Sequence, residues 1–309
     1  MLYLNKIVSY LPQTRRSVSD FAEELQLSAP AASLYQKVYG LQDIAVAGSE
    51  HLRDMLDRAM SAIVPESETE RRQIKYIFHC HAAPCVCPSG ADLVGGLKKK
   101  YGLQHAIAVG LAQDQCATPI TALHLAEILL QDEEENAKVL LLSGETGFHS
   151  SLRLIPNTTI TGDASAACLL AKNGMRNAVL SIAQRKFEFA SVQPVASANL
   201  PIPATSYGDD LIQVVKEALA RAALSMADIA LVLGHNVNTI SWKFFARNFP
   251  CPSELIYLDN VPKSGHCFTS DPFINYCDVV SAGRLKEGDH FIMVSVGTIS
   301  TFAAAVVRH

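Results

Sequence analysis

The sequence predicts an α/β protein in which buried strands alternate with helices. Six short apolar segments have the length and composition of buried strands, at residues 76–79, 106–109, 139–143, 166–171, 229–233 and 291–296. Helical patterns occur at residues 18–25, 51–63, 120–131, 209–223 and 272–282. This alternation is typical of βαβ units, so we expect a mostly parallel sheet. A chain of 309 residues can form one large or two medium domains.

Composition and charge narrow the class of protein. The chain is 49% hydrophobic with a formal net charge of −4 and no long basic block, which gives little support for nucleic-acid binding. No apolar run reaches the roughly 18 residues of a membrane helix. The first residues lack the order of an export signal, and eight cysteines in so long a chain do not indicate a disulfide framework. We therefore expect a soluble protein of a reducing cytoplasm.

The chain divides near a segment rich in Pro, Ser and Ala, at residues 184–207. We expect an N-terminal half over residues 1–183 and a C-terminal half over residues 184–309. Each half has a long helix, an apolar strand and a final run of small residues, at 161–167 and 297–304. Small residues suit places where the backbone closely approaches other backbone or a ligand. The similarity is faint but permits two related βαβ halves.

Cys116 is the leading candidate nucleophile. It follows the apolar segment 106–112 and precedes the helical pattern 120–131, which places it at a strand-to-helix junction. The free N–H groups and the dipole of a helix N-terminus favour a thiolate. The alternative is an ordinary buried cysteine that only fills space.

Three segments could supply partners for this thiol. His235 and Asn238 follow the apolar strand at 229–233, and ligand-binding groups gather at such strand ends. His266 lies in a turn-rich segment before a helical pattern, and Thr298 lies in a small-residue run whose N–H groups could help to bind an oxyanion. Thioester chemistry needs a thiolate, oxyanion donors and imidazoles. A single histidine of this kind is more often structural or solvated than catalytic.

A competing cluster contains His79, Cys80, His81, Cys85 and Cys87. Its spacing fits no common zinc pattern, and side chains at the end of a strand alternate between opposite faces. We therefore expect no metal site and no bound cofactor.

The order of these motifs resembles the thiolase-like condensing enzymes, specifically the β-ketoacyl-acyl-carrier-protein synthase III type. The resemblance spans nearly the whole chain and is carried by five segments in the family's order, at residues 114–117, 161–167, 234–238, 265–270 and 296–308. A further segment, residues 9–12, matches the family's opening strand and turn. The resemblance implies a thiolase-like fold of two similar βαβ halves in a five-layered α-β-α-β-α arrangement, with the helix after Cys116 in the middle. It also implies a homodimer.

The resemblance implies roles for individual residues. Cys116 would carry an acyl group as a thioester, and His235 would stabilise or protonate developing charge. Asn238 would orient its motif, and the N–H groups of Cys116 and Thr298 would form the oxyanion hole. Cys87 falls where a bulky residue often closes the acyl pocket, so we expect it to line that pocket.

The chain also departs from the family. His266 replaces the usual asparagine, which gives the Cys-His-His set of other condensing enzymes of the superfamily. The usual aromatic and basic coenzyme A clamp is not evident at residues 34–40, so we favour a donor bound to acyl carrier protein over an acyl-coenzyme A thioester. These departures favour a specialised member of a secondary-metabolite pathway over a housekeeping initiator of fatty-acid synthesis.

We expect an acyltransferase that forms an acyl-Cys116 thioester. It would pass the acyl group on by decarboxylative condensation with a malonyl-type thioester, in fatty-acid-like or polyketide/secondary-metabolite biosynthesis. One alternative is transfer of the acyl group to a hydroxyl, amine or thiol without decarboxylation. A second alternative, from a different class, is a non-catalytic partner subunit of a condensing enzyme.

Overall fold

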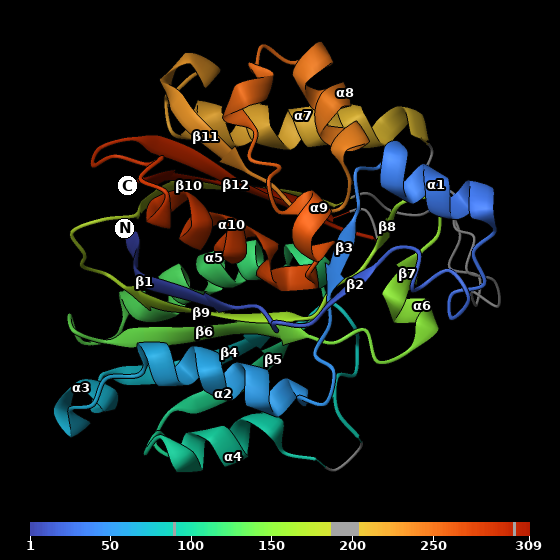
Figure 1. The fold of residues 1–309 in the computed structure, drawn as a ribbon. Helices are drawn as coiled ribbons and strands as arrows, with labels where there is room; N and C mark the ends of the chain where they lie inside the picture. The colour runs from blue at the N-terminus through green and yellow to red at the C-terminus, as the bar shows by residue number, and fades with distance from the viewer. Residues whose placement is uncertain (89–90, 187–203, 299–300) are drawn as a thin grey trace.

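Five layers of helix and sheet make up the molecule in this computed structural model, which describes residues 1–88, 91–186, 204–298 and 301–309 (Figure 1). Helices α7 and α8 cover one outer face, and α2 and α4 cover the other. Helices α5 and α10 lie between the two sheet layers. The expected five-layered, thiolase-like arrangement is therefore confirmed.

The helices of the described residues are α1 (Ala29–Lys37), α2 (Leu52–Ile63), α3 (Glu68–Arg72), α4 (Leu93–Lys100), α5 (Thr118–Gln131), α6 (Ser150–Arg153), α7 (Ala204–Arg221), α8 (Thr239–Asn248), α9 (Val261–Ser264) and α10 (Asp271–Ser281). Four of the five expected helical patterns are confirmed, as α2, α5, α7 and α10, and the fifth is not. Residues 18–25 form consecutive turns instead of the expected helix. Asp20 accepts the N–H of Ser17, and its own N–H bonds to the Ser17 hydroxyl, so local side-chain bonds replace helical ones.

Among the residues that the structure describes, nine strands join in the order β11-β12-β13-β10-β1-β9-β6-β4-β5. They are β1 (Leu2–Tyr10), β4 (Ile74–Cys80), β5 (Ile107–Leu111), β6 (Lys138–Glu145), β9 (Ala164–Ala171), β10 (Ala178–Lys186), β11 (Ile229–Leu233), β12 (His290–Gly297) and β13 (Thr301–Arg308). Two small sheets pair β2 (Arg15–Ser17) with β3 (Asp43–Ala45), and β7 (Leu154–Ile155) with β8 (Thr159–Ile160). Strands β1 and β10 pair only through Leu2 with Val179 and Tyr3 with Ala178, so the two sheet layers meet along a short seam.

The expectation of a mostly parallel sheet is wrong. Only β4–β5, β4–β6 and β11–β12 are parallel among the neighbouring strands of the described large sheet. The other neighbours are antiparallel because each half ends in strands that turn back, β6 to β9 and β12 to β13. Sequence periodicity identifies a buried strand but carries no information on its direction.

The two halves repeat one pairing pattern. Strands β4, β6, β9 and β1 pair as parallel, antiparallel, antiparallel, and β11, β12, β13 and β10 pair in the same way. Strand β10 therefore acts as the first strand of the second half, and the expected boundary between residues 183 and 184 falls inside it. The division into two domains at that point stays a prediction.

The middle layer is the core that positions the candidate nucleophile. Helix α5 begins with Pro119 in its first turn, where a missing N–H costs nothing, and continues in apolar residues. Ala122, Leu123 and Ala126 are buried in a cluster that joins residues of both sheet layers. No helix in the described part of the chain has the length and apolar composition needed to cross a membrane.

Leu123→Ala should destabilise the protein by about 2 to 5 kcal/mol, since Leu123 is 1% exposed between the two sheet layers and truncation leaves a cavity there. Ile128→Ala on the same helix is the matched control, because Ile128 is 48% exposed and should change stability by less than about 0.5 kcal/mol. Urea unfolding followed by circular dichroism measures both, and equal effects would show that α5 is not packed as described.

Candidate active site

Cys116 lies in a tight turn immediately before α5. Residues Gln115–Ala117 form a single 3₁₀ turn, and Gln115 has a φ of 51°, a strained value for a residue with a side chain. The Cys116 side chain is buried, with the residue 2% exposed. The expected position at a helix N-terminus is therefore what the structure shows.

Strand β12 holds this turn from the other half of the chain. Ser295 donates a hydrogen bond to the carbonyl oxygen of Cys116 at 2.8 Å. A Cβ atom on Gly297 would lie 2.4 Å from the carbonyl oxygen of Asp114, so only glycine permits this close approach. The small-residue run noted in the sequence thus serves backbone contact with the nucleophile turn.

Asp114 anchors the turn from within. Its carboxylate accepts hydrogen bonds from Thr121 at 2.7 Å and Gln184 at 2.9 Å, and forms an ion pair with Lys186 at 2.5 Å. Burial raises the pKa of this carboxyl, but Lys186, Thr121 and Gln184 outweigh burial and lower the pKa overall. A charged Asp114 therefore ties the start of α5 to the end of β10.

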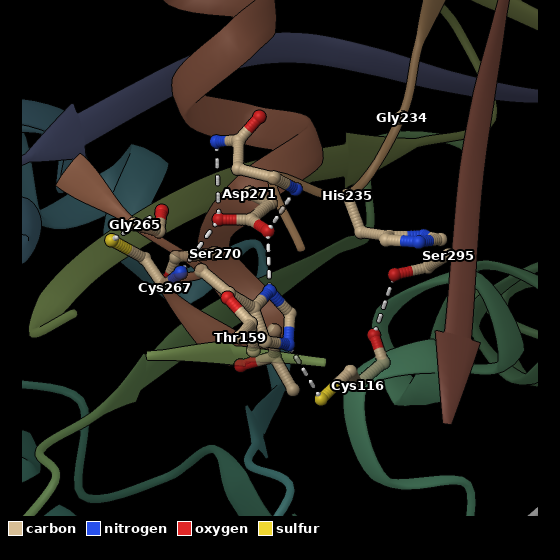
Figure 2. A network of polar contacts seen from close by, with 12 residues as sticks. Cys116, Thr159, Gly234, His235, Gly265, Cys267, Ser270, Asp271 and Ser295 are labelled. Carbon is tan, nitrogen blue, oxygen red and sulfur yellow. Dashed lines mark hydrogen bonds and ion pairs between the residues drawn. The ribbon is translucent and has the colours of Figure 1, made fainter. Parts of the chain in front are cut away.

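His266 lies between the Cys116 thiol and the buried carboxylate of Asp271, and hydrogen bonds connect its ring to both. Cys116 and Asp271 are labelled in Figure 2. His266 Nε2 is 3.2 Å from Cys116 Sγ, and its Nδ1 is 2.6 Å from Asp271 Oδ2. Burial disfavours the charged imidazolium, but Asp271 and then Cys116 outweigh it and raise the pKa of His266 to about 10. The arrangement can therefore hold a proton beside the sulfur and pass it to or from a reacting group.

Asp271 is fully buried and has no role assigned from sequence. It accepts hydrogen bonds from the backbone N–H of Asn236 at 2.5 Å and of Cys267 at 2.8 Å, and from Asn236 Nδ2 at 3.2 Å. These donors satisfy a carboxylate that burial would otherwise destabilise. The only sequence signal was an acidic residue before a proline at a helix start.

His235 lies near His266 but does not touch Cys116 within hydrogen-bond distance in the described contacts. It follows β11, is 1% exposed, and its ring centre is 6.3 Å from that of His266. Its Nε2 is 3.0 Å from the hydroxyl of Tyr207 on α7. Burial, and then the charge of His266, lower the pKa of His235 to about 3, so this ring is neutral.

Asn238 and Thr298 each make hydrogen bonds with other parts of the chain. Asn238 caps α8: its Oδ1 accepts the N–H of Ser241 at 2.9 Å, and its Nδ2 donates to Thr158 O at 3.1 Å. Thr298 follows β12 and its hydroxyl bonds to the Gln115 side chain. Thr298 therefore lies against the nucleophile turn, and the oxyanion-hole role of its N–H and that of Cys116 stays a prediction.

Cys87 lines a different pocket. This hollow of about 330 Å³ lies beside β5, and Cys116 is not among its lining residues, which include His79, His81, Cys85, Cys87 and Val109. The role of Cys87 in an acyl pocket stays a prediction. Within the described ranges no group of three or more His, Cys, Asp or Glu side chains is placed to bind a metal ion.

Glu145 is a second buried acid that sequence reasoning missed. It ends β6, is 1% exposed, and accepts hydrogen bonds from the N–H groups of Ala82 and Ala83. Burial raises its pKa to about 7, although those N–H groups and the charge of His266 oppose the shift. Ala82 packs with Cys116 and Phe268, so Glu145 fixes part of the wall around the thiol.

Comparison with known proteins supports the resemblance. Residues 219–309 match the family described as 3-oxoacyl-[acyl-carrier-protein] synthase III C terminal. The β-ketoacyl-[acyl-carrier-protein] synthase III of Aquifex aeolicus (strain VF5) is 22% identical over 281 residues, which cover 87% of this chain and 88% of that protein. The corresponding protein of Roseiflexus sp. (strain RS-1) is 33% identical over 92 residues, which cover 30% of this chain and 28% of that protein.

Solved structures share the fold over almost the whole chain. The acyltransferase ChlB3 superposes with a TM-score of 0.85 at 20% identity, covering 99% of this chain and 97% of that chain. 3-Oxoacyl-(acyl carrier protein) synthase III from Pseudomonas aeruginosa PAO1 gives a TM-score of 0.80 at 18% identity, covering 99% and 98%. OleA from Xanthomonas campestris gives 0.79 at 14% identity, covering 100% and 98%.

The matched C-terminal region, the relatives and the shared architecture agree with one another. Residues 219–309 match the synthase III C-terminal family, and the chain as a whole is similar in sequence to β-ketoacyl-acyl-carrier-protein synthase III proteins and shares the thiolase-like fold of the solved structures.

Proposed function

We propose that this protein is an acyltransferase that carries an acyl group on Cys116 and passes it to a hydroxyl, amine or thiol acceptor. The observation that carries the proposal is the line of Cys116 Sγ, the His266 ring and the Asp271 carboxylate, with separations of 3.2 and 2.6 Å. A nucleophile, a base and an acid that orients the base form the arrangement of many acyl-transfer enzymes on unrelated folds.

The first step acylates the thiol. Cys116 gives its proton to His266 Nε2, and the sulfur attacks the donor's thioester carbon, so that an Sγ–C bond forms and the donor C–S bond breaks. His266 then gives the proton to the departing thiolate, which leaves as a thiol. N–H groups at the nucleophile turn, those of Cys116 and Thr298, would bind the transient oxyanion.

The second step regenerates the thiol. Acylation removes the Cys116 charge that helps to raise the pKa of His266, so the neutral ring becomes the form available for catalysis. His266 accepts a proton from the acceptor as its oxygen, nitrogen or sulfur attacks the acyl carbon. The Sγ–C bond breaks, and the proton returns from His266 to the sulfur.

Decarboxylative condensation with a malonyl-type thioester is the second candidate. It is supported by the presence of two imidazoles, His235 and His266, and by the similarity to β-ketoacyl-[acyl-carrier-protein] synthase III proteins. Plain transfer ranks first because only His266 is in line with Cys116 and a carboxylate. A non-catalytic partner subunit is the least supported reading, since the thiol retains a base and an orienting acid.

We propose an acyl group bound to acyl carrier protein as the donor, because acyl carrier protein appears in the names of the relatives. An acyl-coenzyme A thioester is the alternative donor. The chemistry described above needs no further cofactor.

A homodimer is proposed through the edge strand β5. In the described residues β5 pairs only with β4, and Ile107 and Val109 are 59% and 38% exposed. Residues two apart on a strand share a face, so these apolar side chains form one surface beside an unpaired edge. A second copy of the chain would cover both.

Incubation with an acyl donor should increase the mass of the intact protein by one acyl group, and Cys116→Ala should abolish this increase. Cys267→Ala is the matched control, because Cys267 is a buried thiol next to His266 and should leave acylation intact. An undiminished mass increase in Cys116→Ala would exclude the thioester mechanism.

Asp271→Asn should slow acylation by about 10²- to 10⁴-fold and lower the pKa of His266 from about 10 by about 1 to 3 units.

The pKa of His266 is higher in the folded protein than its ordinary value of 6.5, so the proton on His266 stabilises the folded state. This contribution is fully present below pH 6.5 and falls as the pH rises towards 10. NMR titration of the ring measures the pKa. An unchanged titration in a folded variant would contradict the proposed role of the carboxylate.

Val109→Lys should shift the protein from dimer to monomer, since it places a charge on the apolar face of β5. Ile240→Lys is the control, because Ile240 is 39% exposed on α8 and lies away from this edge. Sedimentation velocity distinguishes the two, and an unchanged dimer in Val109→Lys would exclude β5 as the interface.

A further inference from the structure

The hydroxyl of Tyr207 forms a hydrogen bond with one ring nitrogen of His235. Tyr207 lies in the first turns of α7, and its oxygen is 3.0 Å from His235 Nε2. Its ring contacts Phe302 of β13 edge to face, with centroids 5.4 Å apart. Burial first, and also the charge of Cys116, raise the pKa of Tyr207, so the phenol keeps its proton.

His235 is fixed on its other sides as well. Trp242 Nε1 donates to the carbonyl oxygen of His235 at 3.0 Å, and the two rings pack with centroids 5.2 Å apart. The adjacent Asn236 is held by Asp271 and Asn275. His235 Nδ1 is buried without a hydrogen-bond partner among the described residues. The ring therefore cannot exchange Tyr207 for another partner without moving tightly packed neighbours.

This contact bears on which reaction the site performs. In a decarboxylative condensation, the bond between the malonyl α-carbon and its carboxylate breaks, carbon dioxide leaves, and the electron pair forms an enolate on the thioester oxygen. Two imidazole N–H donors pointing at that oxygen would stabilise the enolate. Because Nε2 of His235 is hydrogen-bonded to Tyr207, it is not available to donate to the enolate oxygen. His266 keeps its contact with Cys116.

We propose that Tyr207 is a specificity-determining positioning residue, which holds His235 Nε2 and so suppresses decarboxylation in favour of plain acyl transfer. The inference rests on the proposed function of Cys116, but it concerns a residue outside the Cys116–His266–Asp271 line. Tyr207 acts through His235 and needs no contact with the acyl group.

The test compares Tyr207→Phe with the unaltered protein in two measurements. The first is the ratio of carbon dioxide released from a malonyl thioester to acyl groups transferred from an acetyl thioester to an added amine or alcohol. We expect this ratio to rise at least about tenfold in Tyr207→Phe, equivalent to about 1.4 kcal/mol, while the rate of Cys116 acylation changes little. Tyr207→Ala, which also removes the ring, should raise the ratio further.

The second measurement is independent of activity. The ¹⁵N chemical shifts of the His235 ring report the hydrogen bond at Nε2, and they should change in Tyr207→Phe but not in Tyr101→Phe. Tyr101 is the matched control because its hydroxyl donates to Asp57 on the outer α2 layer, away from His235. Both variants lose the hydrogen bonds of one phenol hydroxyl, so a general loss of stability affects both.

The outcomes separate this inference from the proposed function. Absence of Cys116 acylation in the unaltered protein would overturn the proposed function but leave the ¹⁵N result to decide the Tyr207–His235 contact. Normal acylation and transfer, with an unchanged ratio and unchanged ¹⁵N shifts in Tyr207→Phe, would overturn the inference alone. Loss of acylation in a folded Tyr207→Phe would also overturn it, because Tyr207 would then act on the nucleophile.

Discussion

The buried carboxylate of Asp271 is the interaction on which the rest of the candidate site depends. A carboxylate with no exposed surface is costly unless every oxygen is paired. Here the donors come from three places: the ring of His266, the backbone after it at Cys267, and Asn236 beside the other histidine. One charge therefore fixes two loops, the one after β11 and the one before α10, and raises the pKa of His266.

A network of buried asparagine side chains connects to this carboxylate through Asn236. Asn275 donates to the carbonyl oxygen of Gly234 and to Asn236, and Asn260 donates to both Asn275 and Asp278. The side-chain amides of Asn275 and Asn260 therefore each donate to defined acceptors. Few other arrangements would satisfy the hydrogen bonds of these buried amides. The rigidity of the His235 loop follows from this network as much as from apolar packing.

Sequence patterns predicted six of the nine strands in the described large sheet, four helices and the position of Cys116 before a helix, because those features are local. Strand β5 was expected to be buried, but it is largely exposed at the edge of the sheet. The apolar segment before Cys116 and the helical pattern after it are contained within a few residues. The sequence could not predict both hydrogen-bond partners of His266. Asp271 lies five residues away, but the contact with Cys116 spans 150 residues. Tyr207 carried no signal at all, since a tyrosine in an amphipathic helix is indistinguishable from an ordinary packing residue. The predicted parallel direction of most strands was wrong, because an apolar segment does not indicate whether a strand runs parallel or antiparallel to its neighbour.

The two histidines show how one small volume can support different protonation states. Their ring centres are 6.3 Å apart and both are buried, yet the pKa of one is about 3 and that of the other about 10. Burial alone would lower both values; the difference arises because Asp271 and Cys116 favour the charge on His266, and that charge in turn disfavours one on His235. Such divergence assigns separate tasks to similar groups. In the proposed mechanism it also makes proton transfer depend on the state of Cys116, because acylation would remove one of the charges that hold the proton on His266. His266 would then release its proton at the step in which the departing thiolate needs it.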